Sequence, residues 1–471
     1  METKSDTATT PERPRRLRRL LLRRILPGLG ALILIAAALI AYKGWSNMKG
    51  PPPPECAGAP LPRKTFEPPR QLSSAQTPGA RLYDVEPSAA LLPDGSLAVV
   101  YNARDSFFAG TSGLVVGRIG VGGEVTLAPY PTDRAEAFDA WMTAAPDGKV
   151  RIAWLAHDGG RPERNMKIGY AESADGIQYS PPAVGHAPSD CPEGTRGCLD
   201  KPMIAADGKN VYVAYYSDPG GGLRVTRGDL AGPRLPRFQE SVLTGEGAYA
   251  DIFVAPSGAL HLAFVDSLAG DVNRFGDKNL RVAYTRSEDG GKTFTPIVRV
   301  SRDDEQVPFF FSNPQVTVDE QRGFLYIAWP SGTPDGRWDI HLATSPDGGK
   351  TWSRIKVNDD APCASHMTPH TALDPKTGTL HVTWLENRTG TGGLAYAACE
   401  PGGQRCSANE AVNDAPFASY SYERHLKAWL SEYGELVVDA ERRWLHAVWT
   451  QPVLEDGAAV SRIFHARARL P

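Results

Sequence analysis

Residues Ser345–Ser353 read SPDGGKTWS, and Ser287–Phe294 repeat them almost letter for letter as SEDGGKTF. A looser copy, SADGIQYS, lies at Ser173–Ser180. Each copy places a serine and an aspartate around a glycine-bearing turn, with an aromatic residue just after it. Short side-chain oxygens accept hydrogen bonds from the backbone N–H groups of such turns, while the ring packs into the core. The repeat therefore predicts a recurring β-hairpin unit.

A second, broader repeat surrounds these turns. Alternating apolar strands that end in an aromatic residue recur along the chain, and turns such as Pro93-Asp94-Gly95 and Pro146-Asp147-Gly148 precede them. The spacing gives units of about 50 to 65 residues, a length typical of four-stranded propeller blades. We therefore expect an all-β chain that forms a β-propeller of seven blades, with six as the alternative. The strands are Leu97–Tyr101, Val150–Trp154, Val211–Tyr215, Leu260–Phe264, Leu325–Trp329, Leu380–Trp384 and Leu445–Trp449.

The turn pattern Ser-x-Asp-x-Gly-x-Thr-Trp resembles the Asp box, or BNR repeat, of the sialidase-like β-propellers. The copy ending at Trp352 matches it at every defined position, and the copy ending at Phe294 departs only in its aromatic residue. The resemblance implies a turn between the two outer strands of a blade, away from the face that binds ligands. It therefore implies a structural role for Asp175, Asp289 and Asp347. Enzymes, receptors and assembly factors all carry the motif, so it indicates a fold and not an activity.

The six cysteines fit disulfide bonds better than a metal site. Cys399 and Cys406 occupy the Ser and Trp positions of an Asp box in one unit, so a disulfide there would close the same turn covalently. Cys191 and Cys198 repeat that spacing, which leaves Cys56 and Cys363 as a third pair. No CxxC pair or histidine cluster accompanies them. The even number of cysteines, all beyond the apolar N-terminal segment, suits an oxidising compartment.

The N-terminus differs from the rest of this 471-residue chain, whose formal net charge of −3 gives no bias toward nucleic acid. Residues 13–24 hold seven arginines and precede an uncharged apolar run. That run can cross the ~30 Å hydrocarbon layer as a helix, and the arginines before it keep the N-terminus cytoplasmic. A cleaved signal peptide is the competing interpretation. We expect a basic tail at 1–24, a transmembrane helix or uncleaved signal anchor at 25–43, a Pro-rich stalk at 44–80 and a propeller at 81–471, periplasmic or extracellular.

Aligning the seven units on their second strands places one polar or amphipathic residue of each unit just ahead of its first strand. These residues would ring the central channel, and Arg104 and Arg388 follow on return loops of the same face. Arginines and polar groups of this kind suit an anionic or polyhydroxylated ligand. The alternative is that propeller rims are polar because they are solvated. The ring is Glu86, Asp139, Lys201, Tyr249, Asn313, Thr368 and Tyr433; the ligand-binding candidates are Arg104, Lys201, Tyr249, Asn313 and Arg388.

Glycosidic chemistry needs a general acid and either a carboxylate nucleophile or a tyrosine activated by a glutamate. Glu86 with Asp139 is the candidate carboxylate pair. The tyrosine options are Tyr433 beside Glu435, and Tyr420 and Tyr422 beside Glu423. The first unit resembles the opening blade of the sialidases, yet Val85 stands at the position of their catalytic arginine. The arginine clamp of that family therefore cannot be carried over.

Three functions follow from the sequence. The first is a membrane-anchored, extracytoplasmic propeller that binds a glycan or another ligand. The second is a glycoside hydrolase, which requires two carboxyls to face each other at about 5 to 10 Å. The third is an assembly or scaffold propeller. No cofactor, metal or nucleic acid is expected. The carboxyls considered are Glu86, Asp139, Asp251 and Glu435.

Overall fold

The structure is a computed structural model. It describes residues 56, 58–105, 111–160, 163–192, 194–218, 222–232, 234–267, 280–303, 305, 307, 313–333, 337–359, 363–417 and 433–471. The predicted basic tail, the transmembrane helix and the first part of the stalk lie outside these residues. Within them, no helix is both long and apolar enough to cross a bilayer. Residues 51–471 form one compact unit.

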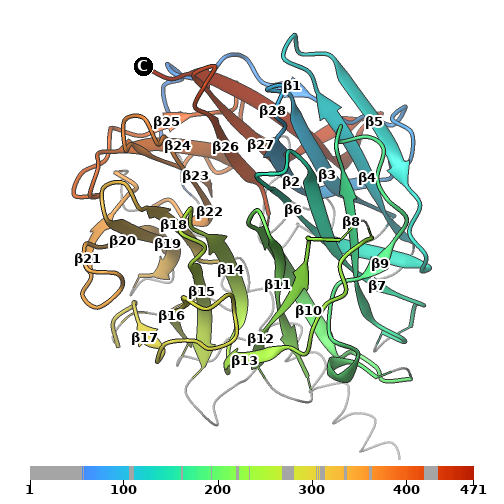
Figure 1. The fold of residues 1–471 in the computed structure, drawn as a ribbon. Coiled ribbons are helices and arrows are strands. Elements are labelled where there is room, and N and C mark those ends of the chain that lie inside the picture. Colours follow the sequence, from blue (N-terminus) through green and yellow to red (C-terminus); the bar gives the residue numbers. More distant parts are fainter. Residues whose placement is uncertain are drawn as a thin grey trace, which may run out of the picture. The chain divides into compact units, whose positions relative to one another are not determined.

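Five separate four-stranded sheets make up most of this unit (Figure 1). In each, four consecutive strands pair antiparallel in chain order. The first sheet holds β6 (Glu136–Ala144), β7 (Val150–His157), β8 (Lys167–Ser173) and β9 (Ala183–Val184), and the second holds β10 (Leu199–Ala206), β11 (Asn210–Ser217), β12 (Gly222–Asp229) and β13 (Val242–Gly245). The others are β14 (Ala248–Val254), β15 (Leu260–Ser267), β16 (Leu280–Ser287), β17 (Val298–Arg299); β18 (Gln315–Asp319), β19 (Phe324–Gly332), β20 (Trp338–Ser345), β21 (Ser353–Lys356); and β22 (His366–Leu373), β23 (Leu380–Glu386), β24 (Gly393–Cys399), β25 (Glu410–Ala411). A short 3₁₀ helix, η2 (Pro188–Asp190), precedes β10.

The remaining strands form one eight-stranded sheet from both ends of the chain. One half is β2 (Tyr83–Leu91), β3 (Leu97–Arg104), β4 (Ser112–Ile119) and β5 (Val125–Tyr130); the other is β26 (Glu435–Asp439), β27 (Trp444–Glu455), β28 (Ala458–Arg469) and β1 (Arg70–Gln71). A single parallel pair, Tyr83 with Ser461, joins the two halves. All seven strands predicted from the second repeat are present, as β3, β7, β11, β15, β19, β23 and β27.

The first strands of these groups contact one another in a closed series. β2 packs against β6, β6 against β10, and so on through β14, β18, β22 and β26 back to β2. Apolar clusters fill the space between consecutive sheets: Trp154 of β7 packs with Val100 of β3, and Trp384 of β23 packs with Leu342 of β20. Burying one such side chain contributes about 1.5–3 kcal/mol or more. This all-β arrangement of four-stranded sheets is that of a propeller.

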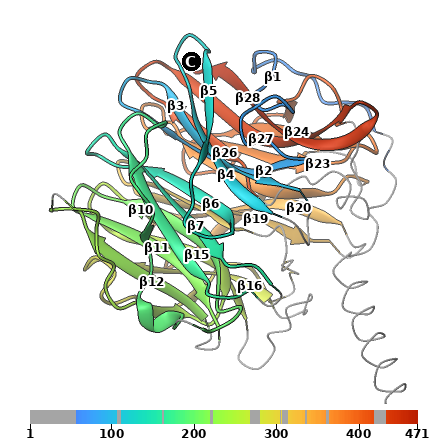
Figure 2. The ribbon, with the colours of Figure 1, turned by 90° about the vertical axis from the view of Figure 1, so that its right-hand side faces the viewer.

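The folded part begins before the predicted boundary at Arg81. Arg70 and Gln71 pair antiparallel with His465 and Phe464, so β1 supplies the outer strand beside β28 (Figures 1 and 2). Phe66 is buried and meets the ring of Tyr396 edge-on, with 5.1 Å between the centroids. The reason for the difference is that β26, β27 and β28 lack a fourth strand, and the segment predicted as stalk provides it.

All three predicted disulfides are present, joining Cys56 to Cys363, Cys191 to Cys198 and Cys399 to Cys406. The last of these links the end of β24 to the loop before β25. Its position corresponds to that of the Asp boxes in other sheets, as the sequence predicted.

Candidate functional site

The Asp boxes lie on the turns between the third and fourth strands of three sheets, at β8–β9, β16–β17 and β20–β21. The Asp347 carboxylate accepts hydrogen bonds from the backbone N–H groups of Lys350 at 3.0 Å and Thr351 at 2.9 Å, and from the hydroxyl of Ser345 at 2.8 Å. These donors hold the pKa of Asp347 well below its usual range. Asp289 and Asp175 make equivalent bonds to their own turns. Their predicted structural role is consistent with this geometry.

The predicted ring residues are here named the channel column, and five of the seven share an unusual backbone conformation. Each of five first strands has a shift of register, and the column residue lies inside the shift with a positive φ. A non-glycine residue in this region is strained by about 1–3 kcal/mol. Such bulges change the direction in which a side chain points. The strained backbone therefore lowers stability but directs these polar side chains. The φ angles are 57° at Glu86, 53° at Asp139, 50° at Lys201, 55° at Tyr249 and 48° at Thr368.

Lys201 lies at the centre of contacts among the channel column. Its ammonium group is 3.4 Å from a carboxylate oxygen of Asp139, and 5.6 Å and 5.0 Å from the ring centroids of Tyr249 and Tyr433. These residues come from β6, β10, β14 and the segment just before β26. All four are buried. We name them the Lys201 cluster; its cation is balanced by one carboxylate and two aromatic faces.

The other two catalytic candidates are held by hydrogen bonds. The amide of Asn102 donates to the Glu86 carboxylate. Ser88 donates to Glu435 at 3.0 Å and accepts the backbone N–H of Met142 at 3.0 Å, which links the strands β26, β2 and β6. The structure thus groups Asp139 and Tyr433 around Lys201, whereas Glu86 and Glu435 have partners of their own.

Two buried carboxyls on the first strands β14 and β26 have raised pKa values. Burial raises the pKa of Asp251 to about 7, although the backbone N–H of Val316 donates to it at 2.8 Å. Burial, together with the charge of Asp251, raises the pKa of Glu435 to about 8. A carboxyl that is protonated near neutral pH is a candidate general acid. Glu435, itself one of the predicted candidates, therefore has the protonation state that a general acid needs.

The space beside Glu435 is small. Thr368, His370, Tyr433 and Gly434 line it, and its volume is about 10 Å³, which is room for about one water molecule. Burial lowers the pKa of His370 to about 3, and its Nδ1 atom has no hydrogen-bond partner in the described part of the chain. A sugar ring does not fit this cavity.

The predicted ligand-binding residues have separate surroundings. The guanidinium of Arg104 lies over the ring of Phe138, 5.5 Å from its centroid. Arg388 donates from Nε to Glu386 at 2.7 Å. Asn313 is buried, and neither of its side-chain amide atoms has a hydrogen-bond partner among the residues described. Of the five candidates, Lys201 and Tyr249 belong to one cluster. In the same described residues, no group of three His, Cys, Asp or Glu side chains is arranged to hold a metal ion.

No model of a protein family matches the chain, and neither does any curated protein. Among solved structures it is similar to a protein of unknown function from Dyadobacter fermentans, at 13% identity over 86% of this chain and 99% of that one, with a TM-score of 0.47. It is also similar to the Trypanosoma rangeli sialidase in complex with sialic acid (13% identity, 88% of this chain and 59% of that one, TM-score 0.44). An α-L-arabinofuranosidase of Fusarium graminearum is 13% identical over 71% and 93% of the chains, with a TM-score of 0.46.

At these identities and TM-scores the neighbours carry no argument about activity, and the fold is established by the chain's own features. Four-stranded sheets pack through their first strands, and Asp boxes close the turns between their outer strands. The chain has a sialidase-like β-propeller fold.

Proposed function

We propose that this protein is a membrane-anchored, extracytoplasmic propeller that binds a glycan or another polar ligand at the face bearing the channel column. The observation that carries this proposal is the set of polar residues held at strained positive φ around Lys201. Strain at non-glycine positions persists where surrounding structure maintains it, and it gathers at functional sites. Hydroxyls, a cation and a carboxylate in one cluster suit a polyhydroxylated or anionic ligand.

The proposal includes seven blades. Among the described residues, Tyr83 and Ser461 form the single strand pair that joins the two halves of the eight-stranded sheet. Four strands lie on each side of this pair. Dividing the sheet there gives one blade of β2–β5 and one of β26–β28 closed by β1. With the five separate sheets this makes seven.

The proposed location rests on the sequence and the disulfides. The apolar run at 25–43 follows a basic segment and suits an anchor with a cytoplasmic N-terminus. Disulfides persist in oxidising compartments, and three are present among the described residues. Both features agree with a propeller in the periplasm or outside the cell.

A glycoside hydrolase is the second candidate, because burial raises the pKa of both Asp251 and Glu435. Either group could serve as a general acid near neutral pH. The cavity beside Glu435 has room for about one water molecule and no sugar. This volume counts against hydrolysis at Glu435, and we favour binding on the face that bears the channel column.

The test is calorimetric titration of residues 51–471 with sialosides, hexuronates and neutral glycosides. The matched variant is Lys201→Gln combined with Asp139→Asn, which removes both charges without leaving one buried alone. We expect it to weaken binding at least tenfold, about 1.4 kcal/mol. Lys350→Gln, on an exposed Asp-box turn, is the control.

Hydrolysis of the same glycosides distinguishes the second candidate. Turnover that Glu435→Gln or Asp251→Asn abolishes would establish the hydrolase. Binding that the Lys201 and Asp139 changes leave intact would contradict the proposed site.

A further inference from the structure

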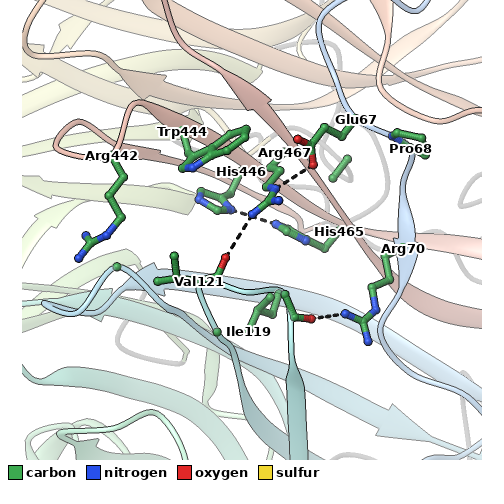
Figure 3. Close-up of a pocket in the computed structure, with 14 residues that line it drawn as sticks. Glu67, Pro68, Arg70, Ile119, Val121, Arg442, Trp444, His446, His465 and Arg467 are labelled. Carbon is green, nitrogen blue, oxygen red and sulfur yellow. Dashed lines mark hydrogen bonds and ion pairs between the residues drawn. The ribbon is translucent and has the colours of Figure 1, made fainter.

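A second site lies where the last strands of the chain, β27 and β28, meet the β2–β5 half of the eight-stranded sheet. Its walls come from the segment before β1, from the ends of β27 and β28, and from the turns after β2 and β4 (Figure 3). These turns lie at the opposite ends of the strands from the channel column. The cavity has a volume of about 180 Å³, well above the about 10–15 Å³ that one water molecule needs. We name it the closure pocket; the residues used below are Arg70, Arg442, Trp444, His446, His465 and Arg467.

Positive charge dominates the closure pocket. Arg70, Arg442 and Arg467 line it, and Arg469 joins Arg467 in stacking on the ring of Trp444, at 4.0 and 4.4 Å from its centroid. Glu67 is the one carboxylate on its walls among the residues that the structure describes.

The hydrogen bonds of these arginines do not use all of their N–H donors. Arg467 donates from Nε to the Glu67 carboxylate at 2.8 Å. One of its terminal nitrogens donates to the backbone oxygen of Val121 at 3.3 Å. Arg442 has a long contact of 3.4 Å to Asp439. Arg70 donates to the backbone oxygen of Gly123. Since each guanidinium carries five N–H donors, several remain for a ligand.

Two histidines, His446 and His465, also line the pocket. His446 is 8% exposed, and its Nδ1 atom lies 3.0 Å from Nε2 of His465. Its own Nε2 atom has no hydrogen-bond partner in the described part of the chain. Buried polar atoms are almost always satisfied. That atom is itself shielded from the cavity, so His446 forms part of the wall and the arginines provide the donors for a ligand.

We propose that the closure pocket binds a small oxyanion, namely a carboxylate, sulfate or phosphate group, free or carried on a sugar. Arg70 and Arg442 bind its oxygens from opposite sides. Guanidinium groups match the geometry of such oxyanions. This site is independent of the Lys201 cluster, so either proposal can fail alone.

The experiment is calorimetric titration of the full-length chain at neutral pH with inorganic phosphate, sulfate and glucuronate as separate probes. We expect at least one probe to bind with a Kd of about 1 mM or tighter. The probe that binds tightest tells which of the three anionic groups the pocket takes. Added salt weakens binding, because it screens the partly exposed charges.

Two variants test the assignment. Arg70→Gln and Arg442→Gln change partly exposed side chains, so the fold is expected to persist, and each should weaken binding fivefold or more, about 1 kcal/mol. Arg405→Gln is the matched control, because Arg405 is 81% exposed and pairs with Glu400 on the β24–β25 turn. The inference is overturned if no probe binds at about 10 mM, or if Arg405→Gln weakens binding as much as the pocket variants.

Discussion

Replacing Asp251 by Asn should make the protein progressively more stable than the wild type as the pH rises. Burial raises the pKa of Asp251 from 3.8 to about 7. A raised pKa means that the folded state prefers the protonated carboxyl. The stability that the protonated Asp251 carboxyl contributes is therefore fully present below pH 3.8. It is lost as the pH rises from 3.8 to about 7. Asn has the shape of the protonated side chain and no proton to lose, so the variant escapes this loss.

The magnitude follows from the pKa change. At about 1.4 kcal/mol for each pKa unit, ionising Asp251 in the folded protein costs about 4 kcal/mol. The free energy of unfolding of Asp251→Asn, minus that of the wild type, should grow by this amount between pH 4 and pH 8. Taking the difference cancels the titration of the buried histidines, such as His186 and His261, which both proteins share.

The assay is urea unfolding of residues 51–471 at several pH values, followed by tryptophan fluorescence. Asp175→Asn provides a contrast of opposite sign, because hydrogen bonds from its own turn lower the pKa of Asp175 despite partial burial. That variant should lose stability relative to the wild type as the pH rises toward 3.8, and the difference should stay level at higher pH. A difference for Asp251→Asn that stays flat from pH 4 to pH 8 would refute the reasoning.

Two further predictions concern the turns and the disulfides. Ser345→Ala should lower the free energy of unfolding by about 1–3 kcal/mol, because Ser345 is buried and its hydroxyl accepts the N–H of Gly349 at 2.8 Å; chemical unfolding checks this, and an equal effect of Lys350→Ala would contradict it. Removing Cys56–Cys363, which closes 307 residues, should cost about 6 kcal/mol, against about 2 kcal/mol for Cys399–Cys406, which closes 7. Equal losses in the two alanine double variants would show that loop length does not set their contributions.

The sequence predicted the strands, the Asp-box turns and the disulfides because these depend on local patterns. Period-two alternation that ends in Trp154 or Trp384 is visible without any partner strand. The channel column was also found, since equal hairpin lengths place Glu86 and Asp139 at equivalent positions. Their positive φ angles were not predictable, because no glycine marks those bulges.

The features that could not be predicted from the sequence depend on contacts between units that are distant in the chain. Lys201 meets Tyr433 only because the ring of sheets brings β10 opposite the segment before β26. The strand Arg70–Gln71 is too short to show alternation. The closure pocket combines that strand with Trp444 and His446 from the other end of the chain, so no local motif could have revealed it.

The pairing of β1 with β28 also fixes the order in which this molecule can be completed. Glu67 and its partner Arg467 are 400 positions apart, and a ribosome adds about 5–20 residues per second. The first strand therefore waits about 20–80 s for its partner to be made. Two prolines, Pro68 and Pro69, precede this two-residue strand, and short strands with proline are poor templates for mispairing. Because β1 has only two residues, it shows no alternating pattern in the sequence. For the same reason it does not readily pair with the edge strand of another sheet before β28 is made.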